Sequence, residues 1–316
     1  MAKYDAIISG YVSLDRVLKI NTPARIGYTS IISNCDNAKM YYGGCCTNIA
    51  FLLAKLRDKP LPIIRLGSED IKSAGLYDTF RDAGVCMAGT TIIEHETTSN
   101  CYLVLDPNRK HITLFYPGAM DRKYAGKLDA DLFSESKLAI LTIGAYEDNV
   151  EFFKKCHETN TPLVFGMKSD FEGFPVPLLK DILHYSEIIF TNEVEREEIE
   201  NLFNLKAITE LFDRGNAKII ITTLGKKGSR YYCKTPDGIE TGSIGAAEVG
   251  APVDTTGCGD AYIAGFIHAY LRGETICDCC KQGSVLSSFV IEKVGCITNA
   301  PTLSEFENRC KEIKNI

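Results

Sequence analysis

The sequence contains no long apolar run, no short-period repeat and no low-complexity tract. No apolar stretch approaches the roughly 18 consecutive residues that a membrane-spanning helix requires, so we expect no membrane partner. The first residues, MAKYDAIISGYVSLD, lack the longer apolar region and the cleavage site of a signal peptide. Glycine (26 residues) and proline (11 residues) are not in excess, which excludes collagen-like and disordered classes. These absences predict a globular, cytoplasmic protein.

An excess of positive charge is also missing. The formal net charge is −6, so the chain is a poor candidate for binding nucleic acid or an acidic membrane over a broad surface. A local basic pocket for a phosphate group stays compatible with this balance, because net charge does not describe a single cleft.

The 13 cysteines do not form the pattern of a disulfide framework, since their number is odd and no signal peptide precedes them. Cys277-Asp278-Cys279-Cys280 contains a C-x-x-C spacing, which leaves a zinc-binding or thiol-redox role as an alternative. A structural zinc site needs a second pair, and only Cys296 and Cys310 follow. We therefore interpret these cysteines as free thiols.

Two nucleotide-binding signatures are absent. No G-x-x-x-x-G-K-[ST] occurs, so the chain is not a P-loop enzyme. No G-x-G-x-x-G follows the first predicted strand, which argues against a dinucleotide-binding dehydrogenase.

Short, continuous apolar runs recur along the chain and alternate with helical stretches. Continuous runs suit strands that are buried on both faces of a parallel sheet, so the alternation predicts a doubly wound α/β fold. The predicted strands are 5–9, 61–66, 138–143, 162–165, 187–191 and 218–223. The clearest predicted helices are 48–56, 149–158, 193–205 and 260–271.

Two segments, at about residues 11–42 and 90–117, break this alternation. The second reads as paired strands, 97–105 and 111–116, around a turn at Asp106-Pro107-Asn108-Arg109. We expect both segments to form a small β-sheet that projects from the core. No linker divides the chain, so residues 1–316 are interpreted as a single domain.

The most informative string is Asp254-Thr255-Thr256-Gly257-Cys258-Gly259-Asp260, which directly precedes a predicted helix. The start of a helix offers unpaired N–H groups, and glycines at 257 and 259 let a ligand approach the backbone closely. Asp260, in the first turn, is placed to accept a proton from a hydroxyl beside a bound phosphate. The alternative is a tight turn with an N-capping aspartate.

This string resembles the second signature of the ribokinase-like (PfkB) kinases, D-T-x-G-[AC]-G-D. The resemblance implies that Asp260 is the general base and that the amides of Gly257, Cys258 and Gly259 stabilise the transferred phosphoryl group. It also places a monovalent cation, potassium, near Asp254. In this family alanine is commoner at the position of Cys258.

Segments that resemble other elements of the family occur in the family's order. Gly43, Gly44 and Asn48 match G-G-x-x-x-N-x-A, and Asp15 matches the aspartate of G-x-x-x-x-D. The resemblance implies that all four bind the hydroxyl groups of the acceptor. A glycine turn with an Asn cap, and a surface aspartate, are the alternatives.

On the nucleotide side, Asn192 and Glu195 match N-x-x-E, which implies a magnesium site reached through water. An acidic first helical turn is the alternative. Thr223, Gly225 and Gly228 match the T-x-G…G contact with ATP. The implied fold is a three-layer α/β/α core with a mostly parallel sheet and a β-sheet lid, and the implied activity is an ATP-dependent kinase.

The acceptor is predicted to be a nucleoside or a sugar. Phe115-Tyr116-Pro117-Gly118-Ala119-Met120 resembles a segment of bacterial nucleoside and adenosine kinases. Aromatic residues that could form a wall for a base are Tyr41, Tyr42, Phe115 and Tyr116, although these rings could equally pack the lid against the core. Cations that could serve a sugar phosphate are Arg25, Lys39 and Arg109.

Two other possibilities concern function and assembly. A catalytically silent, ligand-binding regulator could share the fold, but the retained Asp260, Gly257 and Gly259 argue against it. Lids in this family can pair, so the protein is expected to be a monomer or a lid-mediated homodimer.

Overall fold

The computed structural model describes residues 2–108, 111–248 and 250–313. Within them, a central sheet has nine strands in the order β13-β12-β11-β10-β9-β8-β1-β4-β5. The strands are β1 (Ala6–Ser9), β4 (Pro60–Gly67), β5 (Thr90–Ile93), β8 (Ala139–Leu141), β9 (Leu163–Gly166), β10 (Ile188–Asn192), β11 (Ile219–Thr223), β12 (Ser229–Thr235) and β13 (Gly238–Ile244). Neighbouring strands from β5 to β11 are parallel, and β12 and β13 are antiparallel additions at one edge. Every core strand predicted from a continuous apolar run is present.

The sheet is buried on both faces because its side chains alternate between two apolar clusters. In β1, Ile8 packs on one face and Ile7 on the other, and in β11 Ile221 and Ile220 divide in the same way. One face carries α1 (Cys45–Lys55), α2 (Ile71–Ala74), α3 (Leu76–Asp82), α9 (Cys258–Tyr270), α10 (Ile276–Val290) and α11 (Leu303–Glu312). The other carries α4 (Ala130–Ser134), α5 (Tyr146–Thr159), α6 (Val176–Tyr185), α7 (Glu193–Leu202) and α8 (Leu211–Arg214). The predicted three-layer core is thus confirmed.

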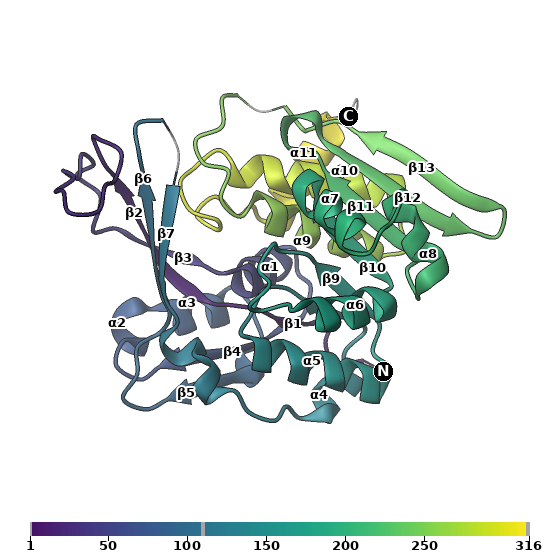
Figure 1. Ribbon diagram of the computed structural model, residues 1–316, viewed down its shortest axis with the longest axis horizontal. Helices are drawn as coiled ribbons and strands as arrows, with labels where there is room; N and C mark the ends of the chain where they lie inside the picture. Colours follow the sequence, from purple (N-terminus) through teal and green to yellow (C-terminus); the bar gives the residue numbers. More distant parts are fainter. Residues whose placement is uncertain (1, 109–110, 249, 314–316) are drawn as a thin grey trace.

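A second sheet of four strands, in the order β3-β2-β6-β7, projects from the core within the described part of the chain. Its strands are β2 (Ser13–Lys19), β3 (Met40–Gly43), β6 (Asn100–Leu105) and β7 (His111–Tyr116). In Figure 1, β2, β6 and β7 lie at the left of the view, far from β12 and β13 at the right. This is the predicted lid sheet, and it combines the two irregular segments of the sequence.

One boundary of the lid differs from the expectation. Residues 90–93 fall within the predicted lid, but β5 pairs in parallel with β4 and extends the central sheet, with Ile64 opposite Thr90. A short β-branched run fits either sheet, and the parallel partner that decides between them is distant in the sequence. Arg109, in the expected lid turn, lies outside the described residues.

The carboxyl ends of the parallel strands lie at one edge of the sheet. The chain first runs outward from β1 to β4 and β5 and then returns to β8 on the other side of β1. Such a reversal opens a crevice beyond the strand ends, where open α/β sheets bind their ligands.

None of the helices in residues 2–108, 111–248 and 250–313 combines the length and apolarity needed to cross a membrane.

Candidate active site

The predicted phosphate-binding turn leads directly into α9. Gly257 has φ +77°, and a Cβ atom there would lie 2.6 Å from both Cβ and Sγ of Cys296, so the position requires glycine. The Asp254 carboxylate accepts hydrogen bonds from the Thr256 N–H (3.0 Å) and the Gly295 N–H (3.1 Å). These contacts hold the turn against the segment that follows α10.

One amide of this turn differs from its expected role. The Cys258 N–H donates to the Thr255 carbonyl at 3.2 Å, because the chain tightens before the helix begins. Among the described residues, the amides of Gly257 and Gly259 have no backbone partner. They are therefore the donors of this turn that can reach a phosphate.

Asp260 is buried in the first turn of α9, and Asn48 on α1 fixes its carboxylate. Asn48 Nδ2 donates to Asp260 Oδ2 at 2.8 Å, and the two side chains are 2% and 5% exposed. The other polar atom of that amide, Asn48 Oδ1, is buried and has no hydrogen-bond partner among the residues that the structure describes. A buried acceptor without a partner is unfavourable, so this atom is suited to accept a hydrogen bond from a ligand hydroxyl.

Asp15 lies on β2, next to the start of α1. Its carboxylate accepts a hydrogen bond from Ser13 Oγ at 2.5 Å and is 8% exposed. Burial raises the pKa of Asp15 to about 6, Ser13 lowers it, and the charge of Asp254 raises it further. A Cβ on Gly43 would lie 2.0 Å from Asp15 Oδ2, and one on Gly44 would lie 2.2 Å from a main-chain oxygen, so both glycines are needed beside Asp15.

Asn192 and Glu195 form a capping box at the start of α7. Asn192 Oδ1 accepts from the Glu195 N–H (2.9 Å), and Glu195 Oε2 accepts from the Asn192 N–H (2.8 Å). Burial raises the pKa of Glu195, although the amide of Asn192 opposes the shift. Both side chains line a small cavity with Thr223, Gly259 and Asp260, so the fold brings the predicted magnesium element to the predicted base.

The remaining residues predicted to contact ATP lie beyond the end of β11. Gly225 and Gly228 have φ values of +57° and +92°, and a Cβ on Gly228 would meet the Ile244 carbonyl oxygen. The loop therefore has a backbone shape that depends on glycine. It does not line the small cavity, which places it farther from Asp260 than Thr223.

Lys168 is a site residue that the sequence interpretation missed. It follows β9 by two residues and lines the same small cavity as Asp260 and Glu195. The available signal was a lone cation just after the predicted strand 162–165, at the edge where ligands bind.

The predicted aromatic wall is only partly assembled. Tyr42 donates to the Ala74 carbonyl oxygen (2.7 Å) and packs edge-on against Phe80, so it belongs to the core. Phe115 of the lid packs against Tyr11, with ring centroids 4.9 Å apart. Tyr11, which was not predicted, lines a cavity of about 710 Å³ between the lid and the loop that contains Phe171.

The two other members of the expected wall serve local contacts. Tyr41 is buried beneath Lys39, whose Nζ lies 4.8 Å from the ring centroid. Tyr116 is half exposed and donates to Glu96 Oε1 at 2.8 Å. Neither contact presents a ring face to the cavity beside Tyr11.

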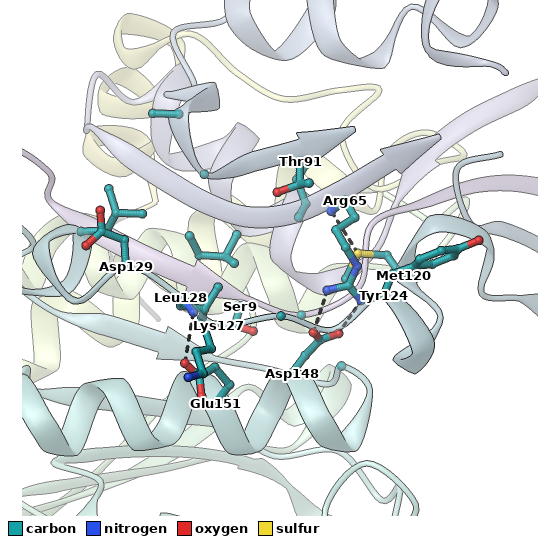
Figure 2. Close-up of a pocket in the computed structure, with 18 residues that line it drawn as sticks. Ser9, Arg65, Thr91, Met120, Tyr124, Lys127, Leu128, Asp129, Asp148 and Glu151 are labelled. Carbon is teal, nitrogen blue, oxygen red and sulfur yellow. Dashed lines mark hydrogen bonds and ion pairs between the residues drawn. The ribbon is translucent and has the colours of Figure 1, made fainter. Parts of the chain in front are cut away.

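A separate cavity of about 360 Å³ lies on the α5 face of the sheet. Figure 2 shows Arg65 and Asp148 paired in its lining, joined by two contacts of 2.7 Å. Arg65 Nε also donates to the Ala119 carbonyl oxygen (2.8 Å), which fixes the chain that leaves the lid. The α9 helix with Asp260 packs on the opposite face, so this cavity is not the candidate active site.

The Cys277–Cys280 segment lies inside α10. Cys279 and Cys280 are buried, and burial raises the pKa of each thiol to about 12. Within the part of the chain that the structure describes, no group of three or more His, Cys, Asp or Glu side chains is placed to hold a metal.

Comparison with known proteins identifies the family. The model of the pfkB family of carbohydrate kinases matches residues 11–303, so the chain belongs to this family. A nucleoside kinase of Methanocaldococcus jannaschii is 31% identical over 96% of this chain and 95% of that protein. A ribokinase of Arabidopsis thaliana is 23% identical over 93% of this chain and 78% of that protein.

Solved structures agree with this assignment. The crystal structure of the Methanocaldococcus jannaschii nucleoside kinase has a TM-score of 0.87 at 26% identity, covering 99% of this chain and 100% of that one. The Burkholderia thailandensis nucleoside kinase in complex with inosine has a TM-score of 0.86 at 21% identity, with 98% of each chain covered. At 21% identity, the likeness to the Burkholderia thailandensis enzyme shows that the two chains share a fold.

Proposed function

We propose that this protein is an ATP-dependent nucleoside kinase in which Asp260 is the general base. The observation that carries this proposal is the buried Asn48–Asp260 hydrogen bond, together with the unpartnered Asn48 Oδ1. The amide holds the base in one orientation, and its free oxygen can accept a hydrogen bond from the acceptor. This arrangement supports binding a hydroxyl group directly beside Asp260.

The chemistry follows from these positions. The acceptor hydroxyl oxygen attacks the γ-phosphorus of ATP, Asp260 takes the proton, and the bond from that phosphorus to the bridging oxygen breaks to release ADP. The amides of Gly257 and Gly259 would donate to the phosphoryl oxygens as charge develops. Asp15, with two acceptor oxygens, suits the pair of vicinal hydroxyls on a ribose ring.

The cavity of about 710 Å³ beside Tyr11 has none of Asp15, Asn48 and Asp260 in its lining, so it does not decide between a nucleoside and a free sugar. Sequence similarity favours the nucleoside. The relative with 31% identity, a nucleoside kinase, supports the same choice.

A sugar phosphate is disfavoured by the positions of the cations that the sequence offered for it. Of the cations considered from the sequence, Arg25 is exposed and Lys39 covers Tyr41, while Arg109 lies outside the described residues.

The acceptor class can be tested by ADP release from magnesium-ATP. The panel contains purine and pyrimidine nucleosides, ribose, fructose and fructose 6-phosphate. We expect kcat/KM for the best nucleoside to exceed that for ribose by about 100-fold, which corresponds to about 3 kcal/mol of base binding. Turnover of ribose or fructose 6-phosphate alone would contradict the nucleoside assignment.

Asn192 and Glu195 fit a magnesium ion held through water. The capping box uses Glu195 Oε2, and among the described residues no hydrogen bond occupies Oε1. A bound magnesium ion would shield the charge of the ATP phosphates.

At Asp254 both carboxylate oxygens already accept hydrogen bonds, so a potassium ion there would need backbone oxygens as well. Activity measured in potassium, sodium and choline chloride tests that second ion.

We also propose that the protein acts in the cytoplasm as a homodimer formed through its lid. The edge strand β7 exposes Ile112 and Leu114, which are 49% and 55% accessible. Exposed apolar side chains on an edge strand favour pairing with a second copy. Light scattering should give twice the chain mass, and Leu114→Lys should give a monomer; a monomeric parent protein would contradict this.

A further inference from the structure

Lys168 occupies a position that the roles proposed above leave without a function. It lines a cavity of about 70 Å³ with Gly259, Asp260, Glu195 and Thr223. These residues come from the ends of β9 and β11 and from the first turns of α9 and α7, so the fold gathers them from four elements. Lys168 is the only cation among the described residues that line this cavity.

The ammonium group of Lys168 has no hydrogen-bond or ion-pair partner among the described residues. In the described part of the chain it forms no ion pair and donates no hydrogen bond, although it is partly buried. Lys218 and Lys281, by contrast, do pair with carboxylates: Lys218 Nζ lies 2.8 Å from Glu187 and Lys281 Nζ lies 3.2 Å from Asp278. A partly buried cation without a partner is suited to an anionic ligand.

The charges around Lys168 keep it protonated. Negative charge on the Cys45 sulfur, where that thiol ionises, and then on the Asp260 and Glu195 carboxylates raises the pKa of Lys168, while burial opposes the shift. The same groups show where the anion would lie. Asp260 repels a phosphate, whereas Lys168 and the free amide of Gly259 attract it, so a phosphoryl group between them is held by the cation and directed at the base.

We propose that Lys168 is a catalytic residue that contacts the phosphoryl group transferred from ATP. This inference rests on the proposed function of the same site. As the new oxygen–phosphorus bond forms and the bond to ADP breaks, negative charge spreads over the phosphoryl oxygens, and the ammonium group stabilises it. The proton of the acceptor still goes to Asp260, the electron pair of the broken bond leaves with ADP, and Lys168 keeps its own protons throughout.

The competing role for Lys168 is to support Asp260 alone. In that case its removal would change how the base titrates but would not alter the binding of nucleotides. Contact with the γ-phosphoryl group predicts the opposite pattern, because ATP and ADP differ in that group only.

The test compares Lys168→Met, which has a similar shape and no charge, with Lys168→Arg, which keeps the charge. Lys180→Met is the control, since Lys180 is exposed on α6. Binding of ADP and of the non-hydrolysable analogue AMP-PNP is measured by calorimetry with magnesium. Steady-state kinetics with the best nucleoside give kcat, both KM values and the pH profile.

For Lys168→Met we expect kcat to fall by about 100- to 1,000-fold, as for the loss of one preorganised donor to a transition state. AMP-PNP should bind at least about 10-fold more weakly, while ADP affinity, acceptor KM and the pH profile stay close to wild type. Lys168→Arg should recover part of kcat, and Lys180→Met should match wild type. Retained ADP binding shows that the variant is folded.

Other outcomes separate the possible failures. If wild type phosphorylates a nucleoside and Lys168→Met keeps its kcat, the inference is wrong and the proposed function stands. If the pH profile moves while AMP-PNP and ADP bind as in wild type, Lys168 only supports the base, which also overturns the inference. If wild type phosphorylates no acceptor, the proposed function fails. The phosphoryl contact is then tested by binding alone: an equal loss of AMP-PNP and ADP affinity in Lys168→Met would reject it.

Discussion

Replacing Asp15 with asparagine should stabilise the free protein while it removes an acceptor contact. Burial raises the pKa of this carboxyl from its ordinary value of 3.8 to about 6. The folded protein therefore prefers the protonated form. The resulting stabilisation is complete below pH 3.8 and is lost as the pH rises through about 6. At pH 8 the ionised carboxylate destabilises the fold by about 3 kcal/mol.

The Asp15→Asn variant would avoid most of this penalty, because its amide carries no charge at any pH. The Ser13 hydroxyl loses a charged acceptor, which costs about 1 kcal/mol, so the expected net gain is about 2 kcal/mol at pH 8. For a chain of 316 residues this corresponds to a rise of about 3 °C in Tm. At pH 4 the gain should be close to zero, because Asp15 is then protonated in the folded protein.

The assay is thermal unfolding between pH 4 and pH 8, with Asp181→Asn as the control because Asp181 is exposed on α6. Activity is measured in parallel, and acceptor KM should rise by about 100-fold for the loss of two charged hydrogen bonds. If the gain in Tm of Asp15→Asn over wild type is no larger at pH 8 than at pH 4, the argument from burial is refuted.

Three further predictions concern the same site. Gly257→Ala should lower both kcat and Tm, because its Cβ would meet Cys296 at 2.6 Å; unchanged values would show that the turn relaxes freely. Asn48→Ala should reduce kcat/KM by about 100-fold or more in steady-state kinetics, since both the base and the acceptor lose a hydrogen bond, and wild-type kinetics would contradict this. EDTA should abolish turnover without changing Tm, because no metal-binding cluster occurs among the described residues; a lower Tm would indicate a structural metal.

The core strands could be predicted from the sequence because both faces of the sheet are buried. Strands such as β11, with Ile219, Ile220 and Ile221, then read as continuous apolar runs. The turn before α9 could be recognised because Gly257 and Gly259 stand in the sequence itself. The contact that makes Gly257 necessary, with Cys296, comes from a distant segment that only the fold brings close.

The features that could not be predicted depend on strand order and register. Lys168 is one of several polar residues that follow strands, and its proximity to Asp260 arises because β9 lies inside the sheet near α9. Tyr41 and Tyr42 lie on opposite faces of β3, so the pattern of two adjacent aromatics could not show that Tyr42 packs against Phe80. The assignment of 90–93 to the lid is wrong for a similar reason, since pairing with β4 is a long-range choice.

The most direct test of Asp260 as the general base is the kcat of Asp260→Asn with magnesium-ATP and the best nucleoside of the panel. Asparagine keeps the size of the side chain and can still contact Asn48, but it cannot take the proton. We predict a loss of about 10,000-fold in kcat, the upper range for removing a general base, with ADP affinity close to wild type. A variant that keeps the kcat of wild type would contradict the assignment of Asp260 as the base.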